Sequence, residues 1–137
     1  IPLRLVGSEM CIRDRPMTGL MAARHLNAGD TAYDLGCSLG ATTLAILQQT
    51  TSPNVSVIGV DNAPAMIAQA REQLSDPRAR FECADLTEFA VTDAKVVVLN
   101  FVMQFLPPAA RLPLLQRLRS QMRSDGLLIV SEKTPSI

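Results

Sequence analysis

Apolar runs alternate along the chain with segments whose apolar residues recur every three or four positions. Short β-branched runs are typical of buried strands, and the longer spaced patterns are typical of amphipathic helices. The runs predict strands over 31–35, 54–60, 80–84, 95–100 and 127–131. The spaced patterns predict helices over 17–26, 42–49, 64–74 and 108–122. Strand and helix therefore alternate, which indicates βαβ units and an α/β fold with a mostly parallel sheet.

The same patterns predict which parts of these elements are buried. The run KVVVLN over 95–100 is continuously apolar through its middle, as expected for a strand covered by helices on both faces. The following side chains of the helices are expected to face the sheet: Leu44, Ile46, Leu47, Met66, Ile67, Ala70, Leu74, Leu112, Leu115, Leu118 and Met122. The connection over 86–93 has no helical pattern, so we expect it to join its two strands without a helix.

The start of the chain differs in character from the rest. Residues 5–15 read LVGSEMCIRDR, which has neither helical nor strand periodicity. This stretch resembles a translated sequencing adapter joined to a partial gene, and an irregular N-terminal arm is the alternative. We therefore predict a non-native or irregular segment over residues 1–16. Residues 17–137 are predicted to form one partial domain, truncated after its fifth strand.

Composition narrows the class of function. Lys and Arg together number 13, as do Asp and Glu, so the formal net charge is zero. A chain that binds a phosphate backbone usually has a basic excess, so we expect no direct nucleic-acid binding. The three cysteines include no CxxC pair, which predicts neither a disulfide framework nor a metal site and favours a cytoplasmic setting. No apolar run is long enough for a membrane span, and no signal peptide is evident, so no membrane partner is expected.

The turn after the first predicted strand, DLGCSLG over 34–40, is the first candidate site. Its glycines, Gly36 and Gly40, are spaced G-x-x-x-G, so they do not match the G-x-G-x-x-G fingerprint of a dinucleotide site. A hydrolase elbow is a second possibility, because GCSLG over 36–40 matches G-x-S-x-G, with Ser38 as the nucleophile. That chemistry needs a histidine base after the serine, and His25, the chain's single histidine, precedes it. Cys37 lacks a base for the same reason.

A third possibility is an S-adenosylmethionine site, which needs one close-approach turn and no pyrophosphate clamp. Carboxylates end three successive strands, and ligands of open α/β sheets bind at that edge. Asp34 can stabilise the ammonium of the ligand, often through water, and Asp61 can accept both ribose hydroxyls. The side chain or neighbouring backbone of Asp85 can receive the adenine amine. The alternative for each acid is that it caps the following helix or turn.

With these residues placed, the chain resembles the carboxy-S-adenosyl-L-methionine synthase family over 20–133. The resemblance rests on four blocks: YDLGCSLGATTLA over 33–45, IGVDNAPAM over 58–66, VVLNFVMQFL over 97–106 and SEK over 131–133. It implies a Rossmann-like class I S-adenosylmethionine-binding fold. It also implies an enzyme that adds a carboxyl group to S-adenosylmethionine, with prephenate as the donor and phenylpyruvate as the second product. A separate enzyme would then use the product to modify wobble uridine in tRNA.

The resemblance also assigns site residues. By this resemblance, the nucleotide is held by seven residues: Gly36, Cys37, Ser38, Asp61, Asn62, Asp85 and Leu86. Asn100 would lie near the sulfonium and the incoming carboxyl group as the catalytic residue, with a strand-end cap as the alternative. The stretch from Phe101 through Met103 to Phe105 could wall the reaction pocket and exclude water, but we expect most of it to be core.

The family pattern extends beyond this chain at both ends. It implies two further strands and a carboxylate-binding arginine after Ile137, a tyrosine near the start, and a homodimer. Arg111, Arg117, Arg119 and Arg123 are not assumed to replace that arginine and are expected on the solvated face of their helix. Two alternatives to a carboxyl-transferring enzyme remain: an ordinary S-adenosylmethionine-dependent methyltransferase and a non-catalytic binding fragment.

Overall fold

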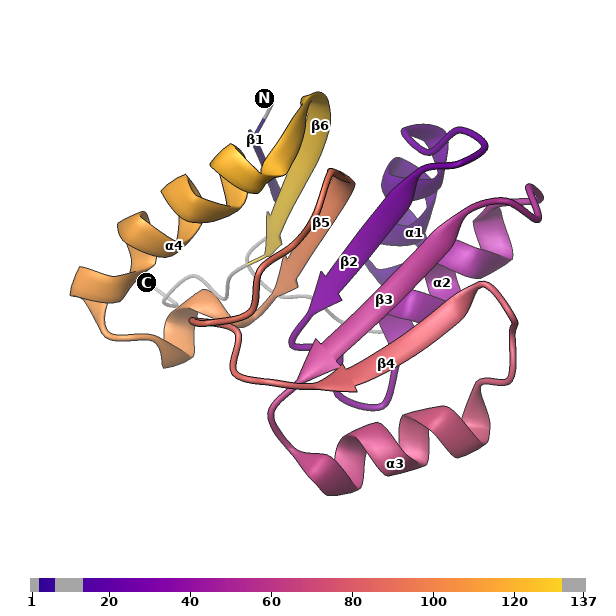
Figure 1. Cartoon of the computed structure of the whole chain (residues 1–137), viewed down its shortest axis with the longest axis horizontal. Helices are drawn as coiled ribbons and strands as arrows, with labels where there is room; N and C mark the ends of the chain where they lie inside the picture. Colours follow the sequence, from indigo (N-terminus) through magenta and orange to yellow (C-terminus); the bar gives the residue numbers. More distant parts are fainter. Residues whose placement is uncertain (1–2, 7–13, 132–137) are drawn as a thin grey trace.

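Six parallel strands form one sheet in the computed structural model, which describes residues 3–6 and 14–131 (Figure 1). Along the sheet the strands run in the order β1-β6-β5-β2-β3-β4. The strands are β1 Leu3–Val6, β2 Thr31–Leu35, β3 Ser56–Asp61, β4 Ala79–Cys83, β5 Ala94–Asn100 and β6 Met122–Ser131. The helices are α1 Asp14–Arg24, α2 Ala41–Gln49, α3 Pro64–Gln73 and α4 Pro108–Gln121, with a short 3-10 helix, η1, over Met103–Phe105. The predicted α/β fold with a parallel sheet is confirmed.

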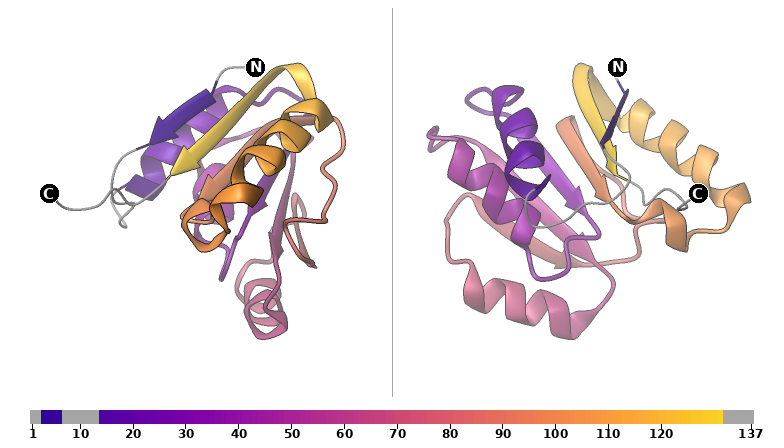
Figure 2. Two further views of the ribbon diagram at one scale, coloured as in Figure 1. Left: turned by 90° about the vertical axis from the view of Figure 1, so that its left-hand side faces the viewer. Right: turned by 180° about the vertical axis from the view of Figure 1, so that it is seen from behind.

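Helices cover both faces of the sheet (Figure 2). On one face, α1 and α2 pack against β5 through side chains such as Val96 and Val98. On the other face, Leu114 and Leu118 of α4 pack against Val97 and the rest of the core on that side. All four valine and leucine side chains over 96–99 are completely buried, as predicted for a strand covered on each side.

The start of the chain contains regular structure where none was predicted. β1 pairs in parallel with β6 over Leu128–Ser131, and α1 begins at Asp14. Without β1, β6 would be an edge strand with unpaired backbone groups, and such an edge readily accepts another strand. Residues 7–13 lie outside the described residues, and the origin of residues 1–16 stays a prediction.

Three apolar side chains that were expected to face the sheet are exposed instead. The exposed fraction is 40% for Leu44, 39% for Met66 and 61% for Leu112. In α4 the buried face runs through Leu114 and Leu118, which are spaced four apart. A helix with many leucines has more than one possible apolar face, and packing against the sheet decides which of these faces is buried.

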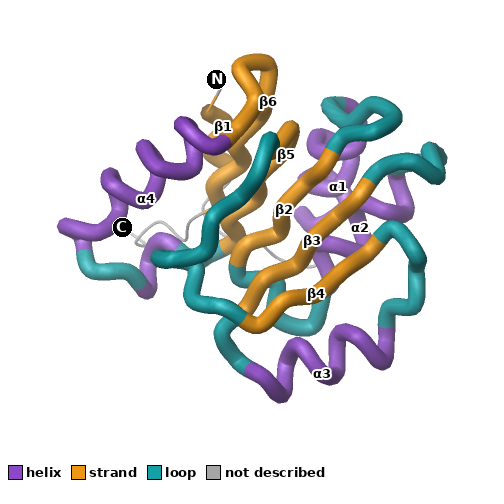
Figure 3. The backbone as a smooth tube through the Cα atoms, viewed as in Figure 1, coloured by secondary structure: helices purple, strands orange, loops and turns teal. Residues whose placement is uncertain are grey.

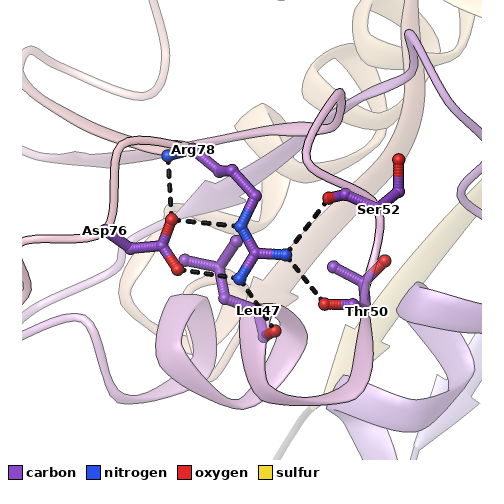
Figure 4. Close-up of polar contacts among 5 residues, drawn as sticks. All are labelled: Leu47, Thr50, Ser52, Asp76 and Arg78. Carbon is purple, nitrogen blue, oxygen red and sulfur yellow. Dashed lines mark hydrogen bonds and ion pairs between the residues drawn. The ribbon is translucent and has the colours of Figure 1, made fainter.

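Arg78 lies just before β4, at the end of the sheet opposite the carboxyl ends of the strands. Its side chain makes hydrogen bonds to several neighbouring segments there (Figure 4). Its guanidinium donates to both carboxylate oxygens of Asp76, at 3.0 and 2.8 Å. It also donates to the carbonyls of Leu47 at 3.2 Å, Thr50 at 2.7 Å and Ser52 at 3.2 Å. The last carbonyls of a helix have no partner within the helix. Arg78 therefore satisfies backbone groups at and just beyond the end of α2.

Candidate functional site

The loops that follow β2, β3, β4 and β5 gather at one edge of the sheet (Figure 3). A cavity of about 440 Å³ lies there, called here the large site cavity. Its lining includes six predicted residues: Gly36, Asp61, Asn62, Asp85, Leu86 and Asn100. The small site cavity, of about 260 Å³, shares Gly36 and Asn100 and adds Cys37 and Ser38. A further hollow of about 570 Å³ between α3 and β4 contains none of the predicted residues.

The turn between β2 and α2 is shaped by residues with positive φ. Gly36 has φ 79°, Ser38 has φ 51° and Gly40 has φ 87°. A side chain at Gly36 would collide with Val102, which lies beside the large site cavity. The backbone N–H groups of Gly36 and Cys37 both donate to the carbonyl of Val60, at 2.7 and 3.0 Å. Both the positive φ and the closeness of Val102 favour glycine at position 36. The close approach of this backbone to a ligand stays a prediction.

Asp61, at the end of β3, is held by two backbone groups. Its Oδ2 accepts from the N–H of Ser38 at 2.9 Å, and its Oδ1 accepts from the N–H of Ala63 at 3.0 Å. A carboxylate has about four acceptor positions, so two remain for a ligand. The side chain is half-buried and lines the large site cavity. It is therefore a fixed, accessible acceptor.

Asp85 follows β4 and is exposed. Its Oδ1 accepts from the N–H of Thr87 at 2.9 Å and from the Thr87 hydroxyl at 2.8 Å. These bonds, led by the one from the backbone, lower the pKa of Asp85 below its usual value. The carboxylate is therefore ionised at neutral pH on the wall of the large site cavity.

Asp34 differs from the other two acids because it is buried behind the turn and lines neither cavity. Its Oδ2 accepts from the hydroxyl of Thr43 at 2.8 Å, while Oδ1 has no hydrogen-bond partner within the described residues. Burial raises the pKa of Asp34 to about 6. The predicted contact between this carboxylate and a ligand ammonium, through water, stays a prediction.

Asn100, at the end of β5, lines both cavities. Its Nδ2 donates to the hydroxyl oxygen of Thr42 at 2.7 Å. Its buried Oδ1 has no hydrogen-bond partner in the described part of the chain. Thr42 and Thr43 were not predicted to be site residues. Their signal was two adjacent hydroxyl residues in the first turn of the helix after the glycine turn.

The residues Phe101, Met103 and Phe105, which follow β5, divide between core and cavity. Met103 is buried in the core, as expected. Phe101 and Phe105 instead line the large site cavity, and Phe105 is 79% exposed. The expectation that most of this stretch is core is therefore wrong for Phe105, and the alternative, a wall of the pocket, fits Phe101 and Phe105.

The structure contradicts a hydrolase site at this turn. Burial, followed by the nearby charges of Asp34 and Asp61, raises the pKa of the Cys37 thiol, which therefore stays protonated. His25 donates from Nε2 to the carbonyl of Asp125 at 2.7 Å, near the amino end of β6. That position is at the opposite end of the sheet from Ser38. Neither Ser38 nor Cys37 therefore has the imidazole base that nucleophilic catalysis needs.

Within residues 3–6 and 14–131, no group of three or more His, Cys, Asp or Glu side chains is arranged to hold a metal ion. The expectation that the site uses no metal stays a prediction. The helices in the same ranges are also too short or too polar to cross a membrane.

A family model described as "Methyltransferase domain" matches residues 32–126. This match runs from β2 into β6 and includes every residue of both site cavities. The chain belongs to this methyltransferase domain family.

Curated relatives of this methyltransferase domain bear out the resemblance noted in its motifs. The carboxy-S-adenosyl-L-methionine synthase of Geobacter metallireducens is 52% identical over 120 residues, which covers 84% of this chain. The protein of the same name from Trichlorobacter lovleyi is 49% identical over the same length. In both cases the alignment covers 49% of the relative. The methyltransferase domain therefore spans about half the length of these relatives.

Solved structures agree with this fold. A TehB-like SAM-dependent methyltransferase from Corynebacterium glutamicum is 27% identical and superposes with a TM-score of 0.66. That similarity covers 83% of this chain and 60% of the other. The SAM-bound amino pentose methyltransferase CalS10 from Micromonospora echinaspora is 22% identical with a TM-score of 0.70, over 86% of this chain and 49% of the other. The class I S-adenosylmethionine-dependent methyltransferase fold is confirmed.

Three of the four arginines on or after α4 of the methyltransferase domain are not simply solvated, contrary to expectation. Arg111 donates to the carbonyl of Leu106 at 3.1 Å. Arg123 pairs with the buried Asp30 at 2.9 Å. Arg117 donates to two carbonyls of the connection between β4 and β5. Arg119 is exposed, as predicted. Guanidinium groups often satisfy backbone carbonyls, which a helical pattern alone does not reveal.

Proposed function

We propose that this chain binds S-adenosylmethionine, with the adenosine in the large site cavity and the amino-acid end toward the small one. The observation that supports this most directly is that Gly36, Asp61 and Asp85 meet at one cavity. Asp61 accepts the ribose hydroxyls with its two remaining lone pairs, beside Asn62. The adenine amine is received by Asp85 with the neighbouring backbone of Leu86. Gly36, Cys37 and Ser38 supply the backbone that approaches the ligand closely.

The reaction that we propose for the whole protein is carboxy-S-adenosyl-L-methionine synthesis. The names of relatives at up to 52% identity support it, although this chain matches about half of their length. The sulfonium acidifies the adjacent methyl group, which loses a proton to become an ylide. Prephenate releases carbon dioxide and hydroxide and becomes phenylpyruvate. The ylide carbon forms a bond with the carbon dioxide, and the proton and the hydroxide leave as water.

Asn100 is the residue that we propose to act beside the sulfonium. Thr42 holds its amide at 2.7 Å, which leaves one N–H of Nδ2 and the free Oδ1 for the ligand. The N–H can donate to the incoming carboxylate, and an unpartnered buried carbonyl oxygen gains from any donor or cationic group brought against it. The product would supply an enzyme that modifies tRNA. We also propose that the whole protein uses prephenate as its substrate and forms a homodimer. In the same proposal it makes no direct contact with nucleic acid and resides in the cytoplasm.

An ordinary methyltransferase is the second candidate, because the family model carries that description. Calorimetric titration of the chain with S-adenosylmethionine tests the binding step, and absence of saturable binding would reject it. Incubation with S-adenosylmethionine and prephenate, followed by mass spectrometry, tests the reaction. Addition of carbon dioxide to the ligand together with phenylpyruvate supports the synthase. The Geobacter metallireducens relative is the positive control.

The two enzymes differ in what remains of the ligand. A methyltransferase leaves S-adenosylhomocysteine and gives no phenylpyruvate. A further outcome is that this chain binds S-adenosylmethionine saturably yet gives no product while the control relative is active. That result would reject catalysis by this chain and keep only its binding of S-adenosylmethionine.

A further inference from the structure

The connection between β4 and β5 is held in place by side chains of α4. Arg117 donates from Nη1 to the carbonyl of Phe89 at 2.6 Å and from Nη2 to the carbonyl of Leu86 at 2.8 Å. Gln121 accepts at Oε1 from the N–H of Val91 at 3.2 Å. Residues four apart lie on the same face of a helix, so Arg117 and Gln121 reach the same stretch of backbone.

Residues 85–89 form a single helical turn that Arg117 completes. The carbonyl of Asp85 accepts from the N–H groups of Glu88 at 3.1 Å and Phe89 at 2.9 Å. Such a turn leaves its later carbonyls without partners within the turn, and Arg117 satisfies two of them. The planar guanidinium can donate two bonds at a fixed spacing, which the single ammonium of lysine cannot reproduce.

The rest of the connection has other supports. The rings of Tyr33 and Phe89 are in contact, with centroids 6.0 Å apart, and the hydroxyl oxygen of Tyr33 accepts from the N–H of Thr92 at 3.2 Å. Loss of Arg117 would therefore release the turn at its Asp85 and Leu86 end without detaching the whole segment. Both of those residues line the large site cavity.

We infer that Arg117 is a positioning residue for base recognition: it holds the 85–89 turn so that Asp85 and Leu86 face the adenine of the ligand. This inference rests on the proposed function, because it concerns where an adenosyl group binds. Asp61 is proposed to bind the ribose from β3, whereas the side-chain hydrogen bonds of Arg117 within the described residues go to Leu86 and Phe89. Loss of Arg117 is therefore expected to weaken recognition of the adenine amine more than it weakens binding of the rest of the ligand.

The test measures affinities for S-adenosylhomocysteine and S-inosylhomocysteine, whose base has a carbonyl where adenine has an amine. R117Q is expected to bind S-adenosylhomocysteine about tenfold more weakly than the wild type, because a charge-assisted support is lost. Its affinity for the inosyl compound changes little, so the preference between the two ligands collapses. R119Q is the matched control, with the same charge change on an exposed position of the same helix, and it is expected to behave as the wild type.

A purely structural role gives a different result. R117Q would then melt at a lower temperature and keep the wild-type preference between the two ligands, which would overturn the inference. R117K, which keeps the charge but can reach only one carbonyl at a time, gives the same comparison if R117Q does not fold. If the wild type binds neither compound, the proposed function fails and this inference fails with it. If the wild type binds the ligands and the Arg117 variants keep its preference between them, the proposed function stands and only the role of Arg117 is overturned.

Discussion

Asp61 accepts a hydrogen bond from the backbone N–H of Ser38 at 2.9 Å, which joins the end of β3 to the glycine turn after β2. The same carboxylate accepts from Ala63 at 3.0 Å. In Asp61→Asn, one of these N–H groups would face an amide NH₂ that cannot accept. We expect affinity for S-adenosylmethionine to fall about tenfold or more, as measured by calorimetry.

Glu72→Gln is the control for this substitution, because it removes one negative charge from an exposed position on α3. Its affinity is expected to equal that of the wild type. An equal fall in affinity in both variants would show that net charge, and not the position of Asp61, determines binding. Wild-type affinity in Asp61→Asn would contradict the contact with the ligand.

Asp34 is expected to make stability depend on pH. Burial raises its pKa to about 6 in the folded chain, from an ordinary value of 3.8. Between these values the folded state keeps a proton that the unfolded state has lost, so the free energy of unfolding falls as pH rises. Above the folded pKa the penalty reaches about 3 kcal/mol. Asp34→Asn should therefore be the more stable protein at about pH 8 and should approach the wild type only as the pH falls below 3.8.

Urea unfolding of both proteins across this pH range measures that difference. Other titrating groups are common to the two chains, so the difference between their curves isolates Asp34. Parallel curves would mean that the pKa of Asp34 is the same in the folded and unfolded states, which would contradict the raised pKa. The same variant is expected to bind S-adenosylmethionine more weakly, because it lacks the negative charge that the sequence predicts beside the ligand ammonium.

Gly59 on β3 leaves room for the ring of Phe81 on β4. A Cβ at position 59 would lie 2.7 Å from Phe81 Cδ1 and 3.0 Å from Cys37 Sγ. Gly59→Ala is expected to lower the free energy of unfolding by about 1–3 kcal/mol through overpacking. Phe81→Leu in the same chain should recover part of that loss, and a double-mutant cycle by urea unfolding measures the coupling. Strict additivity of the two changes would contradict this contact.

Arg78 is expected to support stability without affecting the site (Figure 4). Arg78→Gln leaves carbonyls at the end of α2 without their charged donor, so we expect a loss of about 2–3 kcal/mol in the free energy of unfolding. Arg80→Gln is the control, because that side chain is 70% exposed and lies 3.5 Å from Glu82. Its cost should stay under about 0.5 kcal/mol. Weaker ligand binding by folded Arg78→Gln would contradict a role confined to the far end of the sheet.

Several features of the site followed from sequence order. Helical or turn patterns in the sequence clearly mark the bounds of β2, β3 and β4. Because the strands are parallel, their carboxyl ends lie at one edge of the sheet. The acids Asp61 and Asp85 were therefore expected together, and they line one cavity. Gly36 was recognised because a tight turn with a close approach leaves glycine as the residue that fits.

Other features depended on packing between residues that are distant in the chain. Asp34 also ends a strand region rich in apolar residues, yet its side chain turns toward Thr43 of α2 and is buried. Arg117 has the same helical context as Arg119, and only the path of the segment over 85–89 distinguishes them. The pattern of apolar residues shows which residues share one face of a helix. It does not show which segment of the protein packs against that face.

The sequence alone determined the class of fold, the order of strand and helix from position 31 onward, and the edge of the sheet at which a ligand would bind. These depend on local apolar periodicity and on the geometry shared by all parallel sheets. Tertiary structure alone decided that β1 pairs with β6 and that Leu112 faces outward while Leu114 is buried. It also decided that Thr42 bonds to Asn100 and that Arg117 bonds to the connection between β4 and β5. Those outcomes depend on contacts that form only when distant segments meet, and no local pattern encodes them.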